Sequence, residues 1–211
     1  GGVIFMNSTD VGWMPFVTSW IANREYDTEK TMLLKLFQTY PGVLFEWMRK
    51  NCDTIVPLPE INRIQHLCFI LEGILGNGDS FAGQCKSMGQ EAAGLLLESY
   101  FLFALIWSIG GATFTDKQVD HRKKFHNFVR DEFKTIRFPE EGEIFDWCVD
   151  ETKFPLQMKD EVWSSPWQAW SERVEAYTHD RTSVFGNIYV ATMETQRLTY
   201  LLDLLQPNKH A

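Results

Sequence analysis

The sequence predicts a mainly α-helical protein that ends in a small α/β portion, with a boundary near Phe138. Apolar residues recur every three or four positions over most of residues 10–137, which is the spacing of one helix face. Beyond Phe138 the pattern alternates for a few residues and then becomes rich in Trp and Pro. With 211 residues, 45% of them apolar, the chain is large enough to bury a core.

The first elements predicted are a short strand and a helix. Val3 to Met6 is continuously apolar, as in a strand buried on both faces. Asp10 can cap the following helix, in which Pro15 occupies the first turn. The residues on the buried face of this helix are expected to be Trp13, Phe16, Val17, Trp20 and Ile21.

Three more helices follow in the first half of the chain. We expect one from Thr28 to Tyr40, and Pro41 to begin the next, which carries Leu44, Trp47 and Met48. Pro57-Leu58-Pro59 forms the joint before a helix with an apolar stripe from Ile61 to Leu75. The Gly-rich run that begins at Gly76 ends that helix.

The segment from Ala92 to Phe114 contains a single charge, Glu98, and is long enough to span a bilayer. Glu98 itself, the break at Gly110-Gly111 and the lack of a basic flank argue against a membrane span. We therefore predict a central helix over Leu95 to Ile109 that is buried on all sides. The Gly-rich stretch before it, Phe81 to Gly94, is expected to be a loop.

Thr115 or Asp116 can cap the next helix, which is expected to reach Arg137. Beyond the Pro/Gly turn, Glu143 to Val149 alternates and predicts a strand with Phe145, Trp147 and Val149 on one face. Phe154 to Tyr177 shows little periodicity and predicts an irregular segment or hairpin that packs through its aromatic residues.

A second short strand and a last helix are predicted near the end. Ile188 to Ala191 is patterned as a strand, and Thr192 can cap the helix that Pro207 ends. The residues expected to face inward from this helix are Leu198, Leu201, Leu202 and Leu205.

The net charge and the cysteine content indicate which kinds of partner and which cellular compartment suit this chain. The formal net charge of −8 makes nucleic acid and anionic membranes improbable partners. The four cysteines are widely spaced with no CxxC pair, which predicts free thiols in a reducing compartment. The first residues lack the basic region of a secretory signal.

No residue is predicted to be catalytic or to bind a metal. His121 and His126 are five residues apart and face different sides of a helix, so we expect two solvated histidines. The run from Asp120 to Lys124 is typical of a solvated helix face. The phosphate-binding pattern GxxxxGK[ST] is absent, and so is GxSxG. Glu140, Glu141 and Glu143 lie around a turn, where charged residues are common without catalysis.

Three tryptophans, Trp163, Trp167 and Trp170, stand close together in the irregular segment. Such a group more often packs in the core or forms a protein-docking surface than lines a binding site for a small ligand. We take the three as a candidate docking surface. On that basis one hypothesis for the chain is a free-standing helical module that binds a partner protein through these side chains.

Three stretches, in order along the chain, resemble the motor region of dynein heavy chains. Their amino-acid sequences are most similar to the axonemal outer-arm type. They are Gly2-Val3-Ile4-Phe5-Met6 with Asp10-Val11-Gly12-Trp13, then Phe133-Lys134-Thr135-Ile136-Arg137-Phe138-Pro139, and finally Val190-Ala191-Thr192-Met193-Glu194-Thr195 with Tyr200-Leu201-Leu202-Asp203-Leu204-Leu205. The resemblance implies a mainly α fold, a helical AAA+ lid bundle followed by part of the next AAA+ module. Residues 1–9 would be the terminal strand of the second module's core, 10–137 its helical lid, and 138–211 the start of the third module's core.

The resemblance also implies a function. In that family, AAA+ modules joined in one chain convert ATP binding and hydrolysis into movement along microtubules. This chain would be a non-catalytic part of that ring, binding no cofactor alone, with ATP or ADP and Mg²⁺ in the complete ring. Its partners would be the neighbouring AAA+ modules, with microtubules contacted only indirectly, in the cytoplasm or axoneme. Ile188, Tyr189 and Val190 would lie beside the adenine of the third module's nucleotide.

Overall fold

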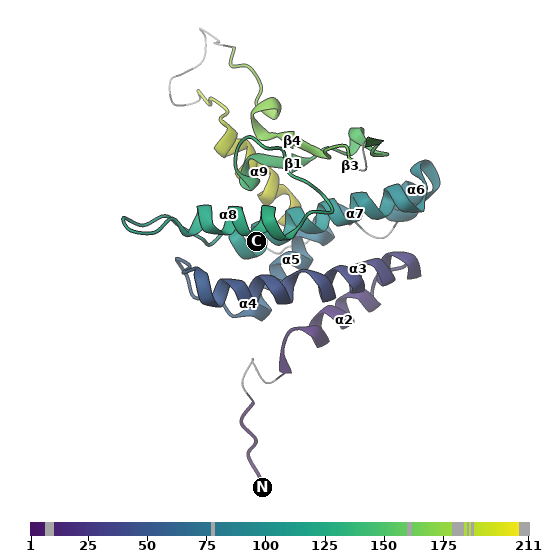
Figure 1. Ribbon diagram of the computed structural model, residues 1–211, viewed down its shortest axis with the longest axis vertical. Helices are drawn as coiled ribbons and strands as arrows, with labels where there is room; N and C mark the ends of the chain where they lie inside the picture. The colour runs from purple at the N-terminus through teal and green to yellow at the C-terminus, as the bar shows by residue number, and fades with distance from the viewer. Residues whose placement is uncertain are drawn as a thin grey trace.

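The computed structural model describes residues 1–6, 11–76, 79–159, 162–178, 184, 186 and 188–206, without the side chains of 79–80, 158–159 and 162–163. Figure 1 shows α2, α3 and α4 on one side of α5 and α7, with the short strands and α9 on the other side. The α-helices in the described residues are α2 (Met14–Ala22), α3 (Asp27–Thr39), α4 (Pro41–Asn51), α5 (Glu60–Leu75), α6 (Asp79–Met88), α7 (Gln90–Leu105), α8 (His121–Glu132) and α9 (Met193–Leu205).

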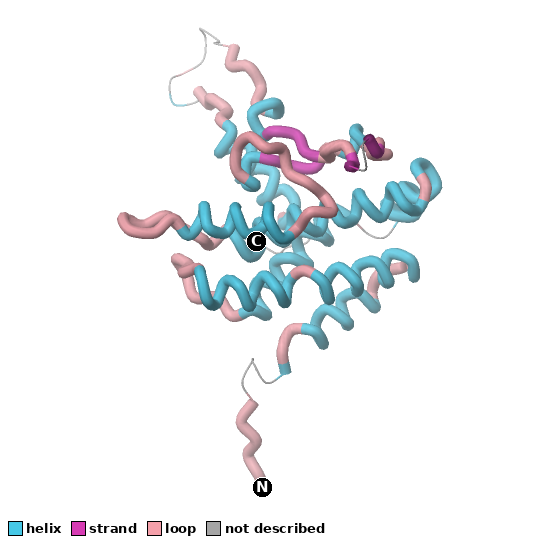
Figure 2. The backbone as a smooth tube through the Cα atoms, viewed as in Figure 1, coloured by secondary structure: helices cyan, strands magenta, loops and turns pink. Residues whose placement is uncertain are grey.

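Among the residues that the structure describes, two small antiparallel sheets lie in the region after residue 146 (Figure 2). In one, β1 (Trp147–Val149) pairs with β4 (Trp167–Ala169), with Val149 opposite Trp167. In the other, β2 (Met158–Lys159) pairs with β3 (Val162–Trp163). The irregular hairpin predicted over Phe154 to Tyr177 is therefore confirmed in outline.

The helices predicted from Thr28, Pro41 and Ile61 are confirmed within one or two residues, whereas α2 begins at Met14 with Trp13, not Asp10, at its N-cap position. The fixed φ of Pro41 suits the first position of a helix, and α4 begins there. Pro59 directly precedes α5, and Gly76, with a φ of 60°, follows its last residue because a left-handed conformation strains other residues. Asp10 and Pro207, predicted at the ends of two helices, lie outside the described residues.

The central helix is buried, as predicted. Every residue of α7 from Ser99 to Leu105 is buried, and a π-helical segment, Ile106–Gly110, continues it. In the described part of the chain, Gln90–Gly110 is the one helix long and apolar enough to cross a membrane, and 72% of its apolar window is buried inside the protein. It contacts α5, α6, α3 and β1, so other elements of the chain cover its apolar faces.

The hydrophobic core continues past Phe138 without a break. Phe145, Trp167 and Trp170 belong to the same buried cluster as the residues of α3, α5 and α7. Phe103 of α7 lies near Trp170, with their ring centroids 6.3 Å apart. Packing alone therefore does not divide the chain near Phe138, and the assignment of 1–9, 10–137 and 138–211 to separate modules stays a prediction.

Several expectations about local structure were wrong. Phe81 to Gly94 is not a loop, because α6 covers most of it and Phe81 is 1% exposed, which anchors the helix on the core. The helix predicted from Thr115 begins instead at His121, capped by Asp120, because Asp116 closes a turn by accepting the Gln118 and Val119 amides.

That helix, α8, also ends five residues early, at Glu132 rather than Arg137. Likewise, the strand predicted from Glu143 begins only at Trp147, after a 3₁₀ turn over Ile144–Asp146. Cys148 and Val149 are 1% and 7% exposed, so both faces of this short strand are covered by the protein.

Neither predicted terminal strand is present. Val3, Ile4, Phe5 and Met6 are 66–92% exposed, and this segment runs away from the body of the protein (Figure 1). Residues 188–191 are irregular, with Tyr189 65% exposed and Val190 50% exposed. A strand needs a hydrogen-bonded neighbour, and the described residues supply none for either segment.

The last helix lies against α5 through one face only. Tyr200, Leu201, Leu204 and Leu205 pack on the core, whereas Leu198 and Leu202 are 50% and 58% exposed. The inward direction predicted for Leu198 and Leu202 was therefore wrong. Gly73 of α5 permits the close approach, because a Cβ at this position would overlap the carbonyl oxygen of Leu204.

Replacing Gly73 with alanine should therefore disturb the docking of α9. We expect Gly73→Ala to lower the free energy of unfolding by about 1–3 kcal/mol, because the new methyl group has no space. Gly83→Ala is the matched control, since Gly83 is also helical and its Cβ would meet nothing within 4 Å. Urea denaturation checks both variants, and a Gly73→Ala protein as stable as the control would contradict the close approach.

Candidate functional site

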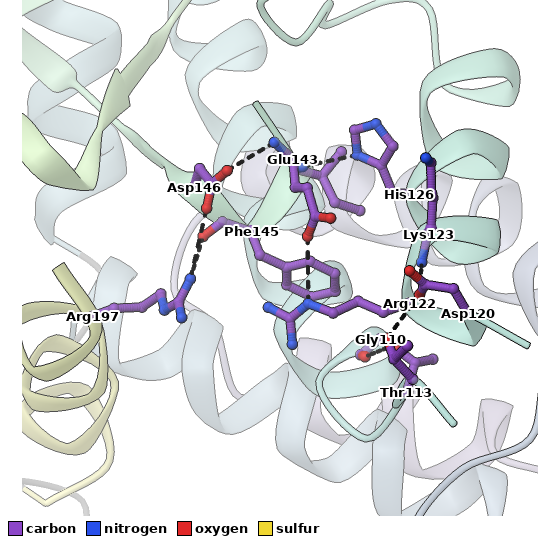
Figure 3. A network of polar contacts seen from close by, with 12 residues as sticks. Gly110, Thr113, Asp120, Arg122, Lys123, His126, Glu143, Phe145, Asp146 and Arg197 are labelled. Atoms are coloured by element: carbon purple, nitrogen blue, oxygen red, sulfur yellow. Dashed lines mark hydrogen bonds and ion pairs between the residues drawn. The ribbon is translucent and has the colours of Figure 1, made fainter. Parts of the chain in front are cut away.

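Polar and aromatic side chains cluster where α8, α9 and the 3₁₀ turn at Ile144–Asp146 meet (Figure 3). This cluster contains cations, carboxylates and a buried aromatic ring rather than the nucleophile or metal-ligand set of an active site. We call it the joint, and it consists of Trp107, Arg122, His126, Glu143, Phe145, Asp146 and Arg197.

The turn at the centre of the joint is held by its own side chains. The Glu143 amide donates to Asp146 Oδ2 at 2.8 Å, and each of these two carboxylates accepts an amide of the other residue. Reciprocal capping of this kind fixes a helix start. The turn places Phe145 in the core, where the residue is 0% exposed. Its ring centroid lies 5.5 Å from that of Trp107.

Arg122 of α8 covers the Phe145 ring. Its guanidinium carbon lies 4.0 Å from the ring centroid, and Nε lies 3.5 Å from Glu143 Oε2. A cation over an aromatic face contributes about 0.5–2 kcal/mol, depending on desolvation. The run from Asp120 to Lys124 was predicted to be a solvated face, which is wrong for Arg122 and for the buried His121.

His126 joins α8 to the same turn. Its Nδ1 accepts the Ile144 amide at 3.0 Å, and burial, followed by the nearby Arg130, lowers its pKa from the ordinary value. His121 similarly accepts the Asp53 amide at 3.1 Å. The expectation of two solvated histidines was wrong, since they are 5% and 9% exposed. Each histidine accepts a hydrogen bond from a loop amide, and the two serve different loops.

Arg197 brings α9 into the joint. Its guanidinium donates to the Phe145 carbonyl at 3.3 Å, lies 3.9 Å from Asp146 Oδ1 and also pairs with Glu194. The side chain is nearly buried, at 6% exposed. The sequence did not predict a role for this side chain. The available signal was a charge on the apolar face of the helix, three and four positions before Tyr200 and Leu201.

Two side chains outside the π-helical segment donate hydrogen bonds to its backbone carbonyls. Arg63 Nη1 donates to the Ile109 carbonyl at 3.3 Å, and the Thr113 hydroxyl donates to the Gly110 carbonyl at 2.6 Å. A side chain at Gly110 would overlap the Phe125 ring. Arg63 also donates to the Leu58 carbonyl, so its contacts hold the bundle together.

The predicted docking surface is not a surface in this chain. Trp167 and Trp170 are 2% and 0% exposed, because the pairing of β1 with β4 turns this segment onto the core. Trp167 stacks on Phe138 with ring centroids 4.1 Å apart, and Trp170 contacts Tyr200 of α9. The prediction was wrong for these two residues, and the side chain of Trp163 lies outside the described residues.

The other predicted residues do not meet at one site. Glu143 pairs with Arg122, and Glu140 offers its backbone carbonyl to Arg130 at 3.0 Å, so both act in the turn. Ile188, Tyr189 and Val190 lie in the irregular segment before α9, and their place beside an adenine stays a prediction. All four cysteines are free, with burial raising the pKa of Cys52 and Cys148 to about 11.

Comparison with known proteins gives consistent matches. Residues 33–172 match the family model described as the dynein heavy chain AAA lid domain. The whole chain is 38% identical to the dynein beta chain of the flagellar outer arm of Chlamydomonas reinhardtii, and 97% of it is 36% identical to the ciliary dynein beta chain of Tripneustes gratilla. It is 35% identical over 97% of its length to human dynein axonemal heavy chain 17. The chain spans only 4% of the length of each of these relatives.

Because the pKa of His126 is lowered, we expect the folded protein to lose stability as the pH falls. A histidine whose folded-state pKa lies below its unfolded value binds fewer protons when folded, so stability falls as pH decreases below about 6.5. We expect wild-type protein to lose more stability than His126→Asn between about pH 7 and pH 5, since asparagine can still accept the Ile144 amide without titrating. Urea midpoints at each pH measure this, with the exposed His66→Asn as control. Equal pH dependence of wild type and His126→Asn would contradict the prediction.

Removing the charge of Arg197 should weaken the joint. Arg197→Met keeps a long apolar side chain but leaves the Phe145 carbonyl without this donor, and we expect a loss of about 1–3 kcal/mol in unfolding free energy. Arg49→Met is the control, because Arg49 is 68% exposed and lies 3.5 Å from Glu60. Its loss should stay below about 0.5 kcal/mol. Equal losses in urea denaturation would show that the buried contacts of Arg197 add nothing.

Proposed function

We propose, from the premise that this chain belongs to the dynein heavy chain family and carries its AAA lid domain, that it couples two AAA+ modules mechanically. In this proposal the helical bundle is the lid of one module, and α9 is the helix that leads into the next. Movement of the lid would carry α9 with it. The chain would thereby link the nucleotide states of two neighbouring modules.

The docking of α9 on the helical bundle is the observation that best supports this proposal. Gly73 allows the backbone of α9 to approach α5, and Arg197 attaches the helix to the Phe145 carbonyl. Packed interiors resist continuous deformation, so elements that share one core tend to move as a body. A helix tied in this way is suited to transmit rotation rather than absorb it.

The resemblance along the chain supports a more specific assignment. We propose that residues 1–9 and 10–137 complete the second module and that 138–211 begin the third, with the neighbouring modules as partners. The exposed Tyr189 and Val190 are free to contact protein beyond this chain, including a nucleotide site of the third module. ATP or ADP with Mg²⁺ would be bound by the complete ring, and microtubules contacted elsewhere in the motor.

We propose that the chain itself does not hydrolyse ATP. Phosphoryl transfer by P-loop proteins uses a backbone cradle, a lysine and a Mg²⁺-binding hydroxyl, and the sequence contains no Gly-Lys pair. The flagellar, ciliary and axonemal names of the relatives support a place in the axoneme. The rival idea of a free-standing module that docks through tryptophans has less support, because Trp167 and Trp170 are buried.

The coupling role can be tested in a dynein heavy chain motor that carries this segment. Arg197→Met should leave basal ATP turnover near the wild-type level but slow microtubule gliding several-fold, because the lid would no longer carry α9 firmly. Arg49→Met should glide at the wild-type speed. Basal turnover checks that the ring is folded. Wild-type gliding by the Arg197→Met motor would contradict the proposed coupling.

A further inference from the structure

A cavity of about 360 Å³ opens between α3 and α7 and shares no residue with the joint. Its walls come from two helices and from the segment after α8. The residues that line it are Met32, Lys35, Leu36, Thr39, Tyr40, Glu91, Gly94, Leu95, Glu98 and Thr135.

One face of α7 forms a wall of the cavity. Glu91, Gly94, Leu95 and Glu98 follow the three- and four-residue spacing of one helix face. Gly94 has no side chain, and a Cβ there would lie 3.3 Å from Met32 Cε of α3. Met32 therefore packs closely against Gly94, and both residues form part of the cavity wall.

Glu98 places a negative charge in this hollow. It is the only charged residue in the apolar segment from Ala92 to Phe114, and the hydroxyl of the buried Tyr40 donates to its carboxylate. Burial raises the pKa of Glu98, an effect that the Tyr40 hydrogen bond and then Lys35 partly offset. Glu91 adds a second, exposed carboxylate at the cavity.

The cavity has a shortage of positive charge. Among the described residues that line it, Lys35 is the one cation, against two carboxylates. Lys35 forms no ion pair within 4.0 Å in the part of the chain that the structure describes. A half-buried carboxylate without a close cation is unfavourable, and an incoming cation would relieve it.

We propose that this cavity binds an arginine side chain of a partner protein. The planar guanidinium would pair with Glu98, and its aliphatic stem would lie against Met32, Leu36 and Leu95. Thr39 and Thr135 offer hydroxyl acceptors for the remaining donors. An anion would meet two carboxylates, and a purely apolar ligand would leave Glu98 unpaired. This inference does not depend on the proposed coupling function.

The test uses the 211-residue chain and two small probes of the same shape. Nα-acetyl-arginine amide carries the guanidinium, and Nα-acetyl-citrulline amide replaces it with a neutral urea. Amide chemical shifts in 15N-labelled protein should change saturably with the arginine probe at residues 32–40 and 91–98. A ligand of this size should bind in the millimolar range, and the citrulline probe about ten-fold more weakly.

Two variants locate the interaction. Glu98→Gln keeps an acceptor for Tyr40 but removes the charge. It should weaken binding of the arginine probe about five- to ten-fold. Lys35→Gln removes the competing cation and should strengthen binding. Glu91→Gln, at the exposed edge, is the matched control and should change the affinity less than Glu98→Gln does.

Several results would overturn the proposal. They are no saturable shifts up to about 50 mM arginine probe, equal binding of the citrulline probe, or unchanged affinity in Glu98→Gln. If Glu98→Gln does not fold, Lys35→Gln decides, and weaker or unchanged binding by that variant overturns the proposal. Saturable shifts at residues outside the cavity would overturn it as well.

Discussion

The rest of the structure depends on one constraint, which is that the second half of α7 must be covered on all of its faces. Every residue from Ser99 to Leu105 is buried, so this part of the helix leaves no side for water. Burying apolar surface stabilises a protein by about 25 cal/mol for each Å², and a helix apolar all round gains this only when neighbours surround it. The bundle of α3, α5 and α6 covers part of α7. The segment after Phe138, with Phe145 and Trp170, covers the remainder.

This constraint explains how α9 comes to lie on the bundle. Once β1 and β4 are packed on α7, the helix that follows contacts both α5 and the turn at Trp170–Arg173. The close approach at Gly73 and the buried contacts of Arg197 then fix its position. The buried Ile144 amide is tolerated because it donates a hydrogen bond to His126. Mechanical coupling follows from packing and from these few directional contacts.

Much of the helical architecture could be predicted from the sequence, because it depends on local signals. Pro41, Gly76 and the apolar stripe of α5 act within a few residues of themselves, and the burial of α7 is evident from its composition. The misses have a different origin. Phe81 gives α6 its tertiary anchor despite glycines that favour a loop, and nothing local shows that Arg197 meets a carbonyl 52 residues away. The partners of the two histidines and the inward turn of Trp167 likewise depend on elements distant in sequence. The two terminal segments patterned as strands find no strand partner among the described residues, and pattern alone does not reveal that.

The central claim is that the bundle and α9 form one mechanical unit, and native-state hydrogen exchange tests it most directly. Amides of α5 and of α9 from Arg197 to Leu204 would be followed as urea is raised in small steps below the unfolding transition. The account predicts that the opening free energies of both helices converge on one line, with the slope of global unfolding. If α9 instead opens at much lower free energy and with little dependence on urea, it moves independently of the bundle, and the account is contradicted.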